Sequence, residues 1–424
     1  MSNDYTKIAL QLQKHGTVQG IMKFVNEESL KEQHKKQEKK KATGIDGVDK
    51  IEYEEKLEEN IKNLIERMKR FSYRPKAVRR VYIPKIGSDK MRPLGIPSYE
   101  DKLVQGNMAE ILNEIYKSIF LDNSYGFRPN RDCHMAIAEL NKIIMTKRIN
   151  YVVDADIKGF FDNVSHEWMI KFLEHVIQDK TFIRYIERFL KAGIMEDMKR
   201  YESDKGTPQG GLISPILANI YLHYVLDLWF KAEIQNKYSG ESYMIRYCDD
   251  FVSCFEKEEE AKRYYEELKT RLKKFGLEIE ETKSKIVKFG KTEGRNKQNE
   301  FDFLGFTHKN GITKSGKYKL VHITSKKKLK DKKKKAKQWL AENIQLPIGE
   351  LIKKINVKLQ GHYRYYGITD NYRKLKAYMW YIRGELYRQL RKRSQRDRTT
   401  WTKFNTILKY NPIARPRIYH KLSV

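Results

Sequence analysis

Two short apolar runs that end in carboxylates constrain the fold of this chain more than any other feature of its sequence. Residues 151–157 read YVVDADI and close on Asp156, and residues 243–255 read YMIRYCDDFVSCF, with Asp249 and Asp250 between two apolar runs. Strands spend apolar side chains on packing, and an acidic pair between two such runs is typical of a hairpin tip. We therefore expect a sheet in which Asp156 and Asp249 lie close together.

Carboxylates placed this way need a partner. Repelling carboxylates at short range are costly unless a cation neutralises them. Mg²⁺ suits oxygen ligands and a phosphate substrate, and Mn²⁺ is an alternative. Two such ions about 4 Å apart would activate a primer 3′-hydroxyl and stabilise the leaving pyrophosphate. Taken alone, the Asp pair also fits ordinary hairpin-turn aspartates.

The charge of the chain indicates a polyanionic partner. The 424 residues carry 86 Lys+Arg against 55 Asp+Glu, a formal net charge of +31. Residues 311–424 hold 31 basic and 6 acidic residues, a net of +25, which leaves 31 − 25 = +6 for the first 310. Each Lys or Arg placed on a phosphate releases condensed counterions. The first 310 residues have the nearly balanced charge of many enzymes, whereas residues 311–424 resemble a basic arm that binds nucleic acid.

Other classes of protein fit less well. A hydrophobic content of 40% favours a folded protein over a disordered one. Cys133, Cys248 and Cys254 are too scattered for a disulfide framework or a zinc site. No apolar run approaches the ~20 residues of a membrane span, and the polar start MSNDYTK is not a signal peptide. We expect a reduced, cytosolic (bacterial-type) protein without membrane segments.

Periodicity and turn residues predict the order of the elements. The predicted helices cover much of residues 3–70, then 102–120, 165–177, 212–230 and 256–275, and the chain is helical and basic beyond 320. The predicted strands lie at 77–85, 151–157, 243–255, 277–289 and 301–308. The run 31–41 is expected to be a solvated helix face or a linker.

Seven motifs in order resemble those of group II intron reverse transcriptase/maturases. The motifs are ATGIDGV (42–48), RPLGIP (92–97), YGFRPNRDCHMAI (125–137), DIKGFFDNVSH (156–166), GTPQGGLISPILANIYL (206–222), IRYCDDF (245–251) and FLGF (303–306). The Tyr-x-Asp-Asp box alone is a weak signal, but seven boxes in the right order are a strong one. The resemblance runs from about residue 40 to the C-terminus.

The resemblance implies the roles of the acidic residues. Asp156, Asp249 and Asp250 match the metal-binding catalytic aspartates, with the Ile157 carbonyl as an extra ligand. Asp154, two residues before Asp156, is the alternative candidate for the first of these three catalytic aspartates. Asp156 is preferred because Phe161, five residues later, then matches the aromatic residue that lies under the incoming sugar and selects dNTPs. Cys248 stands where alanine is commoner.

Further substrate residues follow from the same resemblance. The predicted dNTP contacts are Lys85, Arg92, Phe161, Gln209 and Lys283. Lys85 and Arg92 would grip the triphosphate, although ordinary strand-surface charge is the alternative. Lys283 matches a lysine that assists pyrophosphate departure, but Glu280 replaces the usual asparagine nearby. The predicted primer and template contacts are Gly210, Tyr247, Phe303, Leu304 and Gly305.

The basic third is predicted to bind RNA. KLQGHYRYYG (358–367) resembles the maturase signature, in which aromatic faces such as that of Tyr363 stack on bases while His362 and Arg364 reach phosphates. Its Tyr363 and its other Tyr and Leu residues would otherwise form a small helical core, and both interpretations can hold together. Nine lysines in residues 326–337, Lys332 and Lys333 among them, are further candidates or a solvated face.

The resemblance implies an α+β fold, a right-hand polymerase with fingers, an antiparallel palm sheet and a helical thumb. The expected domains are 1–75 (N-terminal helical extension), 76–310 (fingers and palm), 311–390 (thumb/maturase) and 391–424 (basic RNA/DNA-binding tail). No H-N-H endonuclease module follows, so second-strand cleavage is not expected.

The expected function is an RNA-directed DNA polymerase that binds its intron RNA, assists splicing and copies the RNA from a DNA primer with dNTPs. Two alternatives remain: a domesticated reverse transcriptase in phage defence or a CRISPR-linked system, and an RNA-binding splicing factor without polymerase activity. Retention of all three aspartates favours an active enzyme over the last alternative. The oligomeric state is left open.

Overall fold

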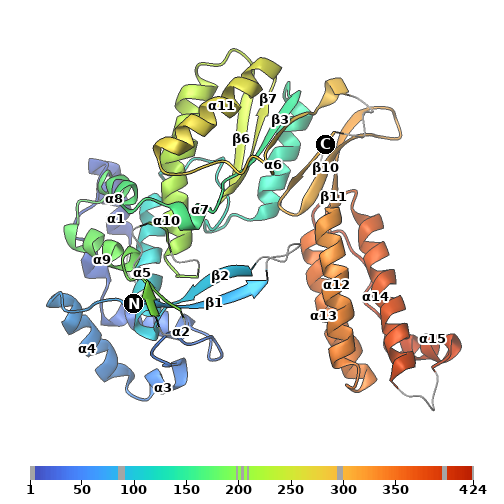
Figure 1. Cartoon of the computed structure of the whole chain (residues 1–424), viewed down its shortest axis with the longest axis horizontal. Coiled ribbons are helices and arrows are strands. Elements are labelled where there is room, and N and C mark those ends of the chain that lie inside the picture. Colours follow the sequence, from blue (N-terminus) through green and yellow to red (C-terminus); the bar gives the residue numbers. More distant parts are fainter. Residues whose placement is uncertain are drawn as a thin grey trace. The chain divides into compact units, whose positions relative to one another are not determined.

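The computed structural model describes residues 5–84, 91–196, 199–201, 205–207, 210–293, 299–393 and 399–422. Within these ranges, backbone contacts divide the chain into two compact units. The first unit comprises the described residues up to Ala136 together with Ala155–Ile286. The second comprises Ile137–Asp154 and the described residues from Val287 onward. Figure 1 shows the elements of both units and labels many of them.

The first unit contains a long buried helix, α5 (Tyr99–Tyr116), whose apolar side chains are buried on several faces. Ser98 starts α5 by accepting a hydrogen bond from the backbone N–H of Asp101. The helices before it are α1 (Thr6–His15), η1 (Ile21–Phe24), α2 (Glu27–Lys36), α3 (Lys50–Glu54) and α4 (Leu57–Lys69). Those after it are α7 (Phe160–Asn163), α8 (His166–Glu174), α9 (Lys180–Leu190), α10 (Ser214–Leu222) and α11 (Glu258–Lys274). Helix α5 packs against α1, α2 and α10.

Two four-stranded sheets carry most of the sequence motifs. One has the order β2-β1-β4-β5, with β1 (Val78–Pro84) antiparallel to β2 (Met91–Ile96) and parallel to β4 (Ile194–Glu196), which pairs with β5 (Lys199–Tyr201). The other has the order β6-β7-β3-β8. Its strands are β6 (Ser242–Tyr247), β7 (Asp250–Phe255), β3 (Tyr151–Asp156) and β8 (Lys285–Lys288).

A π-helical stretch follows α10 and replaces part of the long helix predicted at 212–230. It consists of η2 (His223–Asp227) and η3 (Phe230–Gln235). The wider turn of a π-helix changes which side chains face inward and is common near functional sites. Here η2 buries the side chain of Asp227 completely.

The second unit contains a three-stranded sheet followed by a run of helices. The sheet has the order β11-β10-β9, and its strands are β9 (Glu300–Phe303), β10 (Phe306–Ile312) and β11 (Tyr318–Thr324). The helices are α12 (Lys326–Asn343), α13 (Ile348–Tyr366), α14 (Tyr372–Lys392) and α15 (Trp401–Tyr410). Helix α6 (Cys133–Thr146) contributes mainly to this unit, and η4 (Lys291–Glu293) precedes the sheet.

A single apolar core holds the helices of the second unit together. It includes Leu340 of α12, Leu351 and Leu359 of α13, Leu386 of α14 and Phe404 of α15. Figure 1 shows α12, α13 and α14 running alongside one another, with α15 at the end of α14. The expected mixed α+β class with antiparallel sheets and a helical C-terminal part is confirmed. The four-part domain division stays a prediction.

Candidate active site

The hairpin of β6 and β7 carries Asp249 at its tip. Tyr247 pairs with Asp250, so Cys248 and Asp249 form a two-residue turn. Cys248 has a φ of +59° while Asp249 does not, which is the pattern of a type II′ turn. Glycine is usual at that first position, so Cys248 holds a strained conformation. Burial raises the pKa of its thiol well above the usual range, so the thiol stays protonated and is not a nucleophile.

Asp156 and Asp249 lie within electrostatic reach of each other, because β3 is the neighbour of β7 in the sheet. Burial raises the pKa of the Asp249 carboxyl, and the charge of Asp156 raises it further. The guanidinium of Arg92 acts in the opposite direction and lowers it. The structure therefore brings together two predicted catalytic carboxylates and one predicted triphosphate contact.

A short turn ties Lys283 to the end of β3. The ammonium of Lys283 lies 2.6 Å from Oδ2 of Asp156, and the Asp156 amide donates to Oγ of Ser284 at 3.1 Å. The Asp156 carbonyl accepts from the Glu280 amide at 2.8 Å. The strand predicted near 277–289 is confirmed as β8 (Lys285–Lys288) and an isolated bridge from Ile279 to Ile157, and residues 280–284 form this turn instead. Lys283 compensates the Asp156 charge.

The residues present fit a divalent cation that is shared with substrate. Within the described ranges, no three His, Cys, Asp or Glu side chains form a ready-made metal cage. Mg²⁺ is usually held by one or two carboxylates and completes its shell with water and substrate phosphates. Asp156 and Asp249 supply that number of carboxylates. Asp250 is exposed at the start of β7, Ile157 is buried directly after β3, and Asp154 is half-buried two residues before Asp156.

The GTPQGG turn contacts both the region of Phe161 and strand β2. The Thr207 amide donates to the Phe161 carbonyl at 2.8 Å, and Phe161 itself is half-buried. Gly210 has a φ of +115°, and a Cβ there would lie 2.6 Å from the Gly95 carbonyl oxygen. Only glycine permits this approach. Gln209 and Lys85, both predicted dNTP contacts, lie outside the described residues.

The segment 123–126 supports the catalytic hairpin. The Arg246 amide donates to the Asn123 carbonyl at 2.8 Å, and the Tyr125 amide donates to the Arg246 carbonyl at 2.9 Å. Gly126 packs so closely that a Cβ would lie 2.5 Å from the Cys248 backbone nitrogen. Tyr247, a predicted primer contact, is half-buried, with its ring centroid 6.4 Å from that of Phe127.

Arg246 is a structural residue of the site for which the sequence predicted no role. Its side chain is fully buried and makes five hydrogen bonds: to both carboxylate oxygens of Asp227 at 2.8 and 2.5 Å, to Asn219 at 2.9 Å, to Ser124 at 2.8 Å and to the Cys248 carbonyl at 3.0 Å. The last bond fixes the turn that presents Asp249. An arginine within an apolar strand was the available signal, because arginine is rarely buried unless paired.

The FLGF hairpin of the second unit has a tight turn. Phe303 pairs with Phe306, and Leu304 and Gly305 both have positive φ, of +50° and +79°, as in a type I′ turn. The Leu304 carbonyl accepts a hydrogen bond from the Tyr365 hydroxyl at 3.0 Å. Phe303 is buried. The hairpin exists as predicted, while its contact with a primer stays a prediction.

The predicted RNA contacts divide into exposed and buried residues. Lys332 and Arg364 are exposed, and Lys333 lies over the Tyr381 ring at 5.0 Å. His362 and Tyr363 are 4% and 1% exposed, so the prediction that they face RNA is wrong for this structure. The core interpretation of that segment holds for both, because they face inward from α13. Burial lowers the pKa of His362 to about 4, which removes the charge that a phosphate contact would need.

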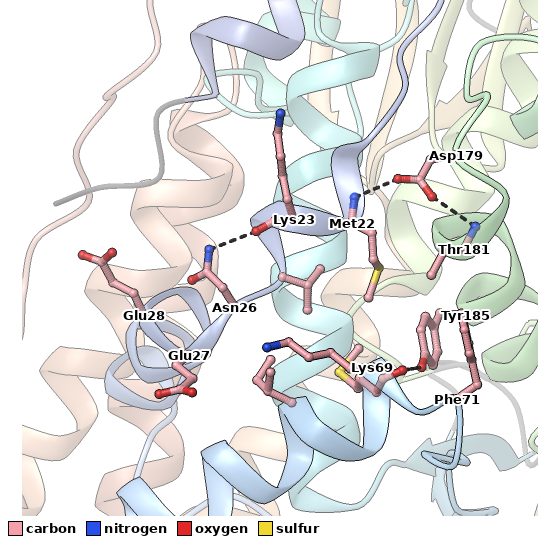
Figure 2. A pocket seen from close by; sticks show the side chains of 13 residues that line it. Met22, Lys23, Asn26, Glu27, Glu28, Lys69, Phe71, Asp179, Thr181 and Tyr185 are labelled. Carbon is pink, nitrogen blue, oxygen red and sulfur yellow. Dashed lines mark hydrogen bonds between the residues drawn. The ribbon is translucent and has the colours of Figure 1, made fainter.

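A cavity of about 820 Å³ lies apart from these residues in the first unit. It is formed by η1, the start of α2, the end of α4 and the start of α9, and Figure 2 shows its lining. Asp179 connects two of these elements, accepting from the Met22 amide at 2.9 Å and from the Thr181 amide at 3.0 Å. None of the predicted catalytic or substrate residues lines it.

Comparison with known proteins identifies the family. Residues 83–308 match the family described as reverse transcriptase (RNA-dependent DNA polymerase), which is more than half of the chain. The chain belongs to the reverse transcriptase family. Residues 329–406 also match the domain described as group II intron, maturase-specific domain. Both matches agree with the resemblance that the seven motifs indicated.

Named relatives come from bacteria and from yeast, and two of the three below are named as intron proteins. The chain is 45% identical over 185 residues to the group II intron-encoded protein LtrA of Lactococcus lactis, covering 44% of this chain and 30% of that protein. It is 37% identical over 184 residues to protein YkfC of Escherichia coli, covering 42% and 48%. A putative COX1/OXI3 intron 1 protein of Saccharomyces cerevisiae is 39% identical over 163 residues, covering 38% and 19%. These matches span less than half the length of each relative.

Among solved structures, telomerase from Candida albicans aligns with a TM-score of 0.45 and 11% identity, covering 85% of this chain and 65% of that one. None of the described helices combines the length and apolar character that crossing a membrane would require.

Proposed function

We propose that this chain is an RNA-directed DNA polymerase of the group II intron-encoded type, which binds its intron RNA, assists splicing and copies the RNA into DNA. The observation that carries the proposal is the placing of Asp156 beside Asp249, with Arg92 and Lys283 as the nearby cations. The match to the reverse transcriptase family supports the DNA synthesis, and the match to the maturase-specific domain supports the assistance of splicing.

In the proposed reaction the 3′-oxygen of a DNA primer attacks the α-phosphorus of a dNTP. A new P–O bond forms as the bond from that phosphorus to the β-phosphate oxygen breaks, pyrophosphate leaves, and the hydroxyl proton passes to solvent. Two divalent ions, when bound, would lower the pKa of the attacking hydroxyl and neutralise charge on the leaving group. Asp156 and Asp249 would hold them, with Asp250 and the Ile157 carbonyl completing the set.

The chain's own cations would bind the triphosphate. Arg92 lies near Asp249, and Lys283 contacts Asp156. Both cations therefore lie next to the carboxylates at which the triphosphate would bind. Placed cations stabilise the charge that develops on phosphoryl oxygens. Lys85 and Gln209 would add further contacts. Phe161 would lie beneath the sugar and exclude a 2′-hydroxyl.

The remaining predicted residues would hold nucleic acid. Gly210 and Tyr247 would approach the primer and template strands in the first unit. Phe303, Leu304 and Gly305 would contact the primer from the second unit. Exposed Lys332 and half-buried Lys333 of α12, together with exposed Arg364 of α13, would bind the phosphates of the intron RNA.

Primer extension on an RNA template tests the polymerase. Asp249→Asn should remove activity with Mg²⁺ or Mn²⁺, because one cation ligand loses its charge. Glu278→Gln is the matched control, since its carboxylate pairs with Lys158 at the surface with an N···O distance of 3.6 Å. If the wild-type protein extends primers no better than Asp249→Asn, the polymerase proposal fails.

Cation binding can be followed without activity. A ligand that binds the native state raises the midpoint of unfolding. Mg²⁺ should therefore raise the thermal midpoint of the wild-type protein and of Glu278→Gln more than that of Asp249→Asn. Equal shifts in all three proteins would show that the cation binds elsewhere.

Splicing provides a separate test of the maturase half. Asp249→Asn should still assist splicing of the cognate intron, because the proposed RNA contacts lie in the second unit. Loss of splicing assistance together with DNA synthesis would contradict this separation of the two activities.

A further inference from the structure

An alternating row of cationic and aromatic side chains runs along α14 and continues onto α15. On α14, Lys376, Trp380, Arg383, Tyr387 and Arg391 follow one another at intervals of three or four residues. Side chains at that spacing lie on one face of a helix. Trp401, at the start of α15, joins the same row through contacts with Arg383 and Tyr387. We call Trp380, Arg383, Tyr387 and Trp401 the aromatic stripe.

Direct contacts order the stripe. The Arg383 guanidinium carbon lies 4.7 Å from the Trp380 ring centroid and 5.1 Å from that of Trp401. The Trp401 and Tyr387 centroids are 4.6 Å apart, with the rings at 88°. Nη2 of Arg383 donates to Oδ1 of Asn405 at 2.6 Å, which fixes the guanidinium between the two indoles. Figure 1 shows α15 at the end of α14, where these contacts form.

The two indoles are exposed to an extent that packing alone does not explain. Trp380 is 47% exposed and Trp401 is 45% exposed. A tryptophan placed only to join two helices gains most when its large apolar surface is buried. Here Phe404 fills the core position under α15 and is fully buried, so the helix is anchored without the outer face of Trp401. Exposed aromatic surface of this kind marks an interaction site.

The charge around the stripe identifies the partner as an anion. Helix α14 has seven Lys and Arg residues against one acid, Glu385, and that acid is buried and bonded to Arg388 and Gln389. Helix α15 has two lysines and no acid. Ring faces interleaved with cations suit unpaired nucleotides, because an aromatic ring stacks on a base while the cations neutralise phosphates. A duplex covers its base faces and cannot use such a surface.

We propose that the aromatic stripe is a binding site for an unpaired stretch of RNA, with Trp380 and Trp401 stacking on bases and Arg383 between them. The proposal rests on the proposed function and deepens it. We assign RNA rather than DNA as the ligand, because the whole stripe lies within residues 329–406, the part that matches the group II intron maturase-specific domain. The stripe would read bases, whereas the lysines of α12 would contact phosphates.

Trp380→Ala is the first variant, because Trp380 contacts Arg383 and anchors no core residue. A fluorescein-labelled oligo(U) is the probe, titrated by anisotropy with the full chain. Loss of one base stack should weaken binding about 5- to 150-fold. Trp380→Phe, which keeps a ring, should retain most of the affinity. Tyr410→Ala is the matched control, since Tyr410 is 77% exposed but lies nine residues from Trp401, on the opposite side of α15.

Two further measurements separate stacking from charge. The dependence of affinity on salt should be unchanged in Trp380→Ala, because no phosphate contact is removed. The loss should vanish on an abasic ribose-phosphate chain and on an RNA duplex. A loss of the same size on either ligand would overturn the proposal. Wild-type affinity of Trp380→Ala for oligo(U), or an equal loss in Tyr410→Ala, would also overturn it.

Oligo(dT) and primer extension complete the test. A Trp380→Ala defect that is larger on oligo(dT) than on oligo(U) would assign the surface to DNA and refute the choice of RNA. Extension of a short pre-annealed primer on an RNA template by the wild-type protein reports on the proposed polymerase separately from the stripe. If wild type extends primers and Trp380→Ala binds oligo(U) normally, only the stripe proposal fails. If wild type does not extend primers, the proposed polymerase fails whatever the binding result.

Discussion

Replacing Arg246 with methionine should destabilise the first unit and disturb the catalytic turn. Methionine occupies a similar elongated volume without a charge. Asp227, which is fully buried, would then lose its bidentate partner, and the Cys248 carbonyl would lose the donor that fixes it. We therefore expect both a loss of stability and a loss of DNA synthesis.

The magnitude follows from the contacts. Five hydrogen bonds to a charged group at ~1.5–3 kcal/mol each would sum to ~7–15 kcal/mol, as much as the whole stability of a typical domain. Such sums are not additive, because removing the first partner already disrupts the rest. Breaking a buried ion pair by removing one member costs about 3–5 kcal/mol. We expect a value in that range for Arg246→Met.

Adding Asp227→Asn to Arg246→Met should recover a substantial part of the loss, because no charge then stays buried without a partner. Urea unfolding followed by tryptophan fluorescence measures the free energy, with the slope checked in each variant. Lys262→Met is the control, since its ion pair with Glu258 is exposed and is worth at most about 0.5 kcal/mol. A cost below about 1 kcal/mol for Arg246→Met, or a double variant as unstable as the sum of the single variants, would refute the reasoning.

Three further predictions concern other parts of the molecule. Gly210→Ala should greatly reduce primer extension, because its Cβ would lie 2.6 Å from the Gly95 carbonyl, whereas Gly361→Ala in α13 meets nothing within 4 Å and should stabilise the protein in thermal melts. Acid should destabilise the second unit as pH falls from about 6.5 to about 4, by up to about 3 kcal/mol. The reason is that burial lowers the pKa of His308 to about 4, so that between these pH values the unfolded chain binds a proton at His308 and the native state does not. His308→Asn should therefore flatten the dependence of the urea midpoint on pH. Neutralising Lys332–Lys335 should weaken RNA binding and reduce the slope of log affinity against log salt by up to about 0.7 for each phosphate that is no longer neutralised; an unchanged slope would identify these lysines as a solvated face.

The sequence predicts the catalytic hairpin well, because its signal is local. Alternating apolar residues on both sides of an Asp pair define the two strands and the turn, and the structure has β6 and β7 there. The position of β3 beside β7 was expected because Asp156 and Asp249, as carboxylates at short range, need a common cation. The order of strands and helices followed from their periodicity, whereas the polymerase fold followed from the resemblance that the seven motifs carry.

The parts that the sequence did not reveal depend on contacts distant in the chain. The partners of Arg246 come from segments near residues 124, 219 and 227, and no local pattern links them. Strand β11 was missed because it lies at the start of a region whose sequence is otherwise helical and basic. His362 and Tyr363 look like RNA contacts in sequence, yet the packing of α13 turns them inward.

The turn of the FLGF hairpin is fastened to α13 at adjacent residues. The Tyr365 hydroxyl bonds to the Leu304 carbonyl, and a Cβ at Gly305 would lie only 3.2 Å from the Tyr366 hydroxyl. These contacts couple the hairpin tip to the C-terminal end of α13, so the two are expected to move together. Arg364 is exposed one residue earlier. A ligand that immobilises the outer face of α13 at Arg364 will consequently also set the angle of the hairpin, without touching it.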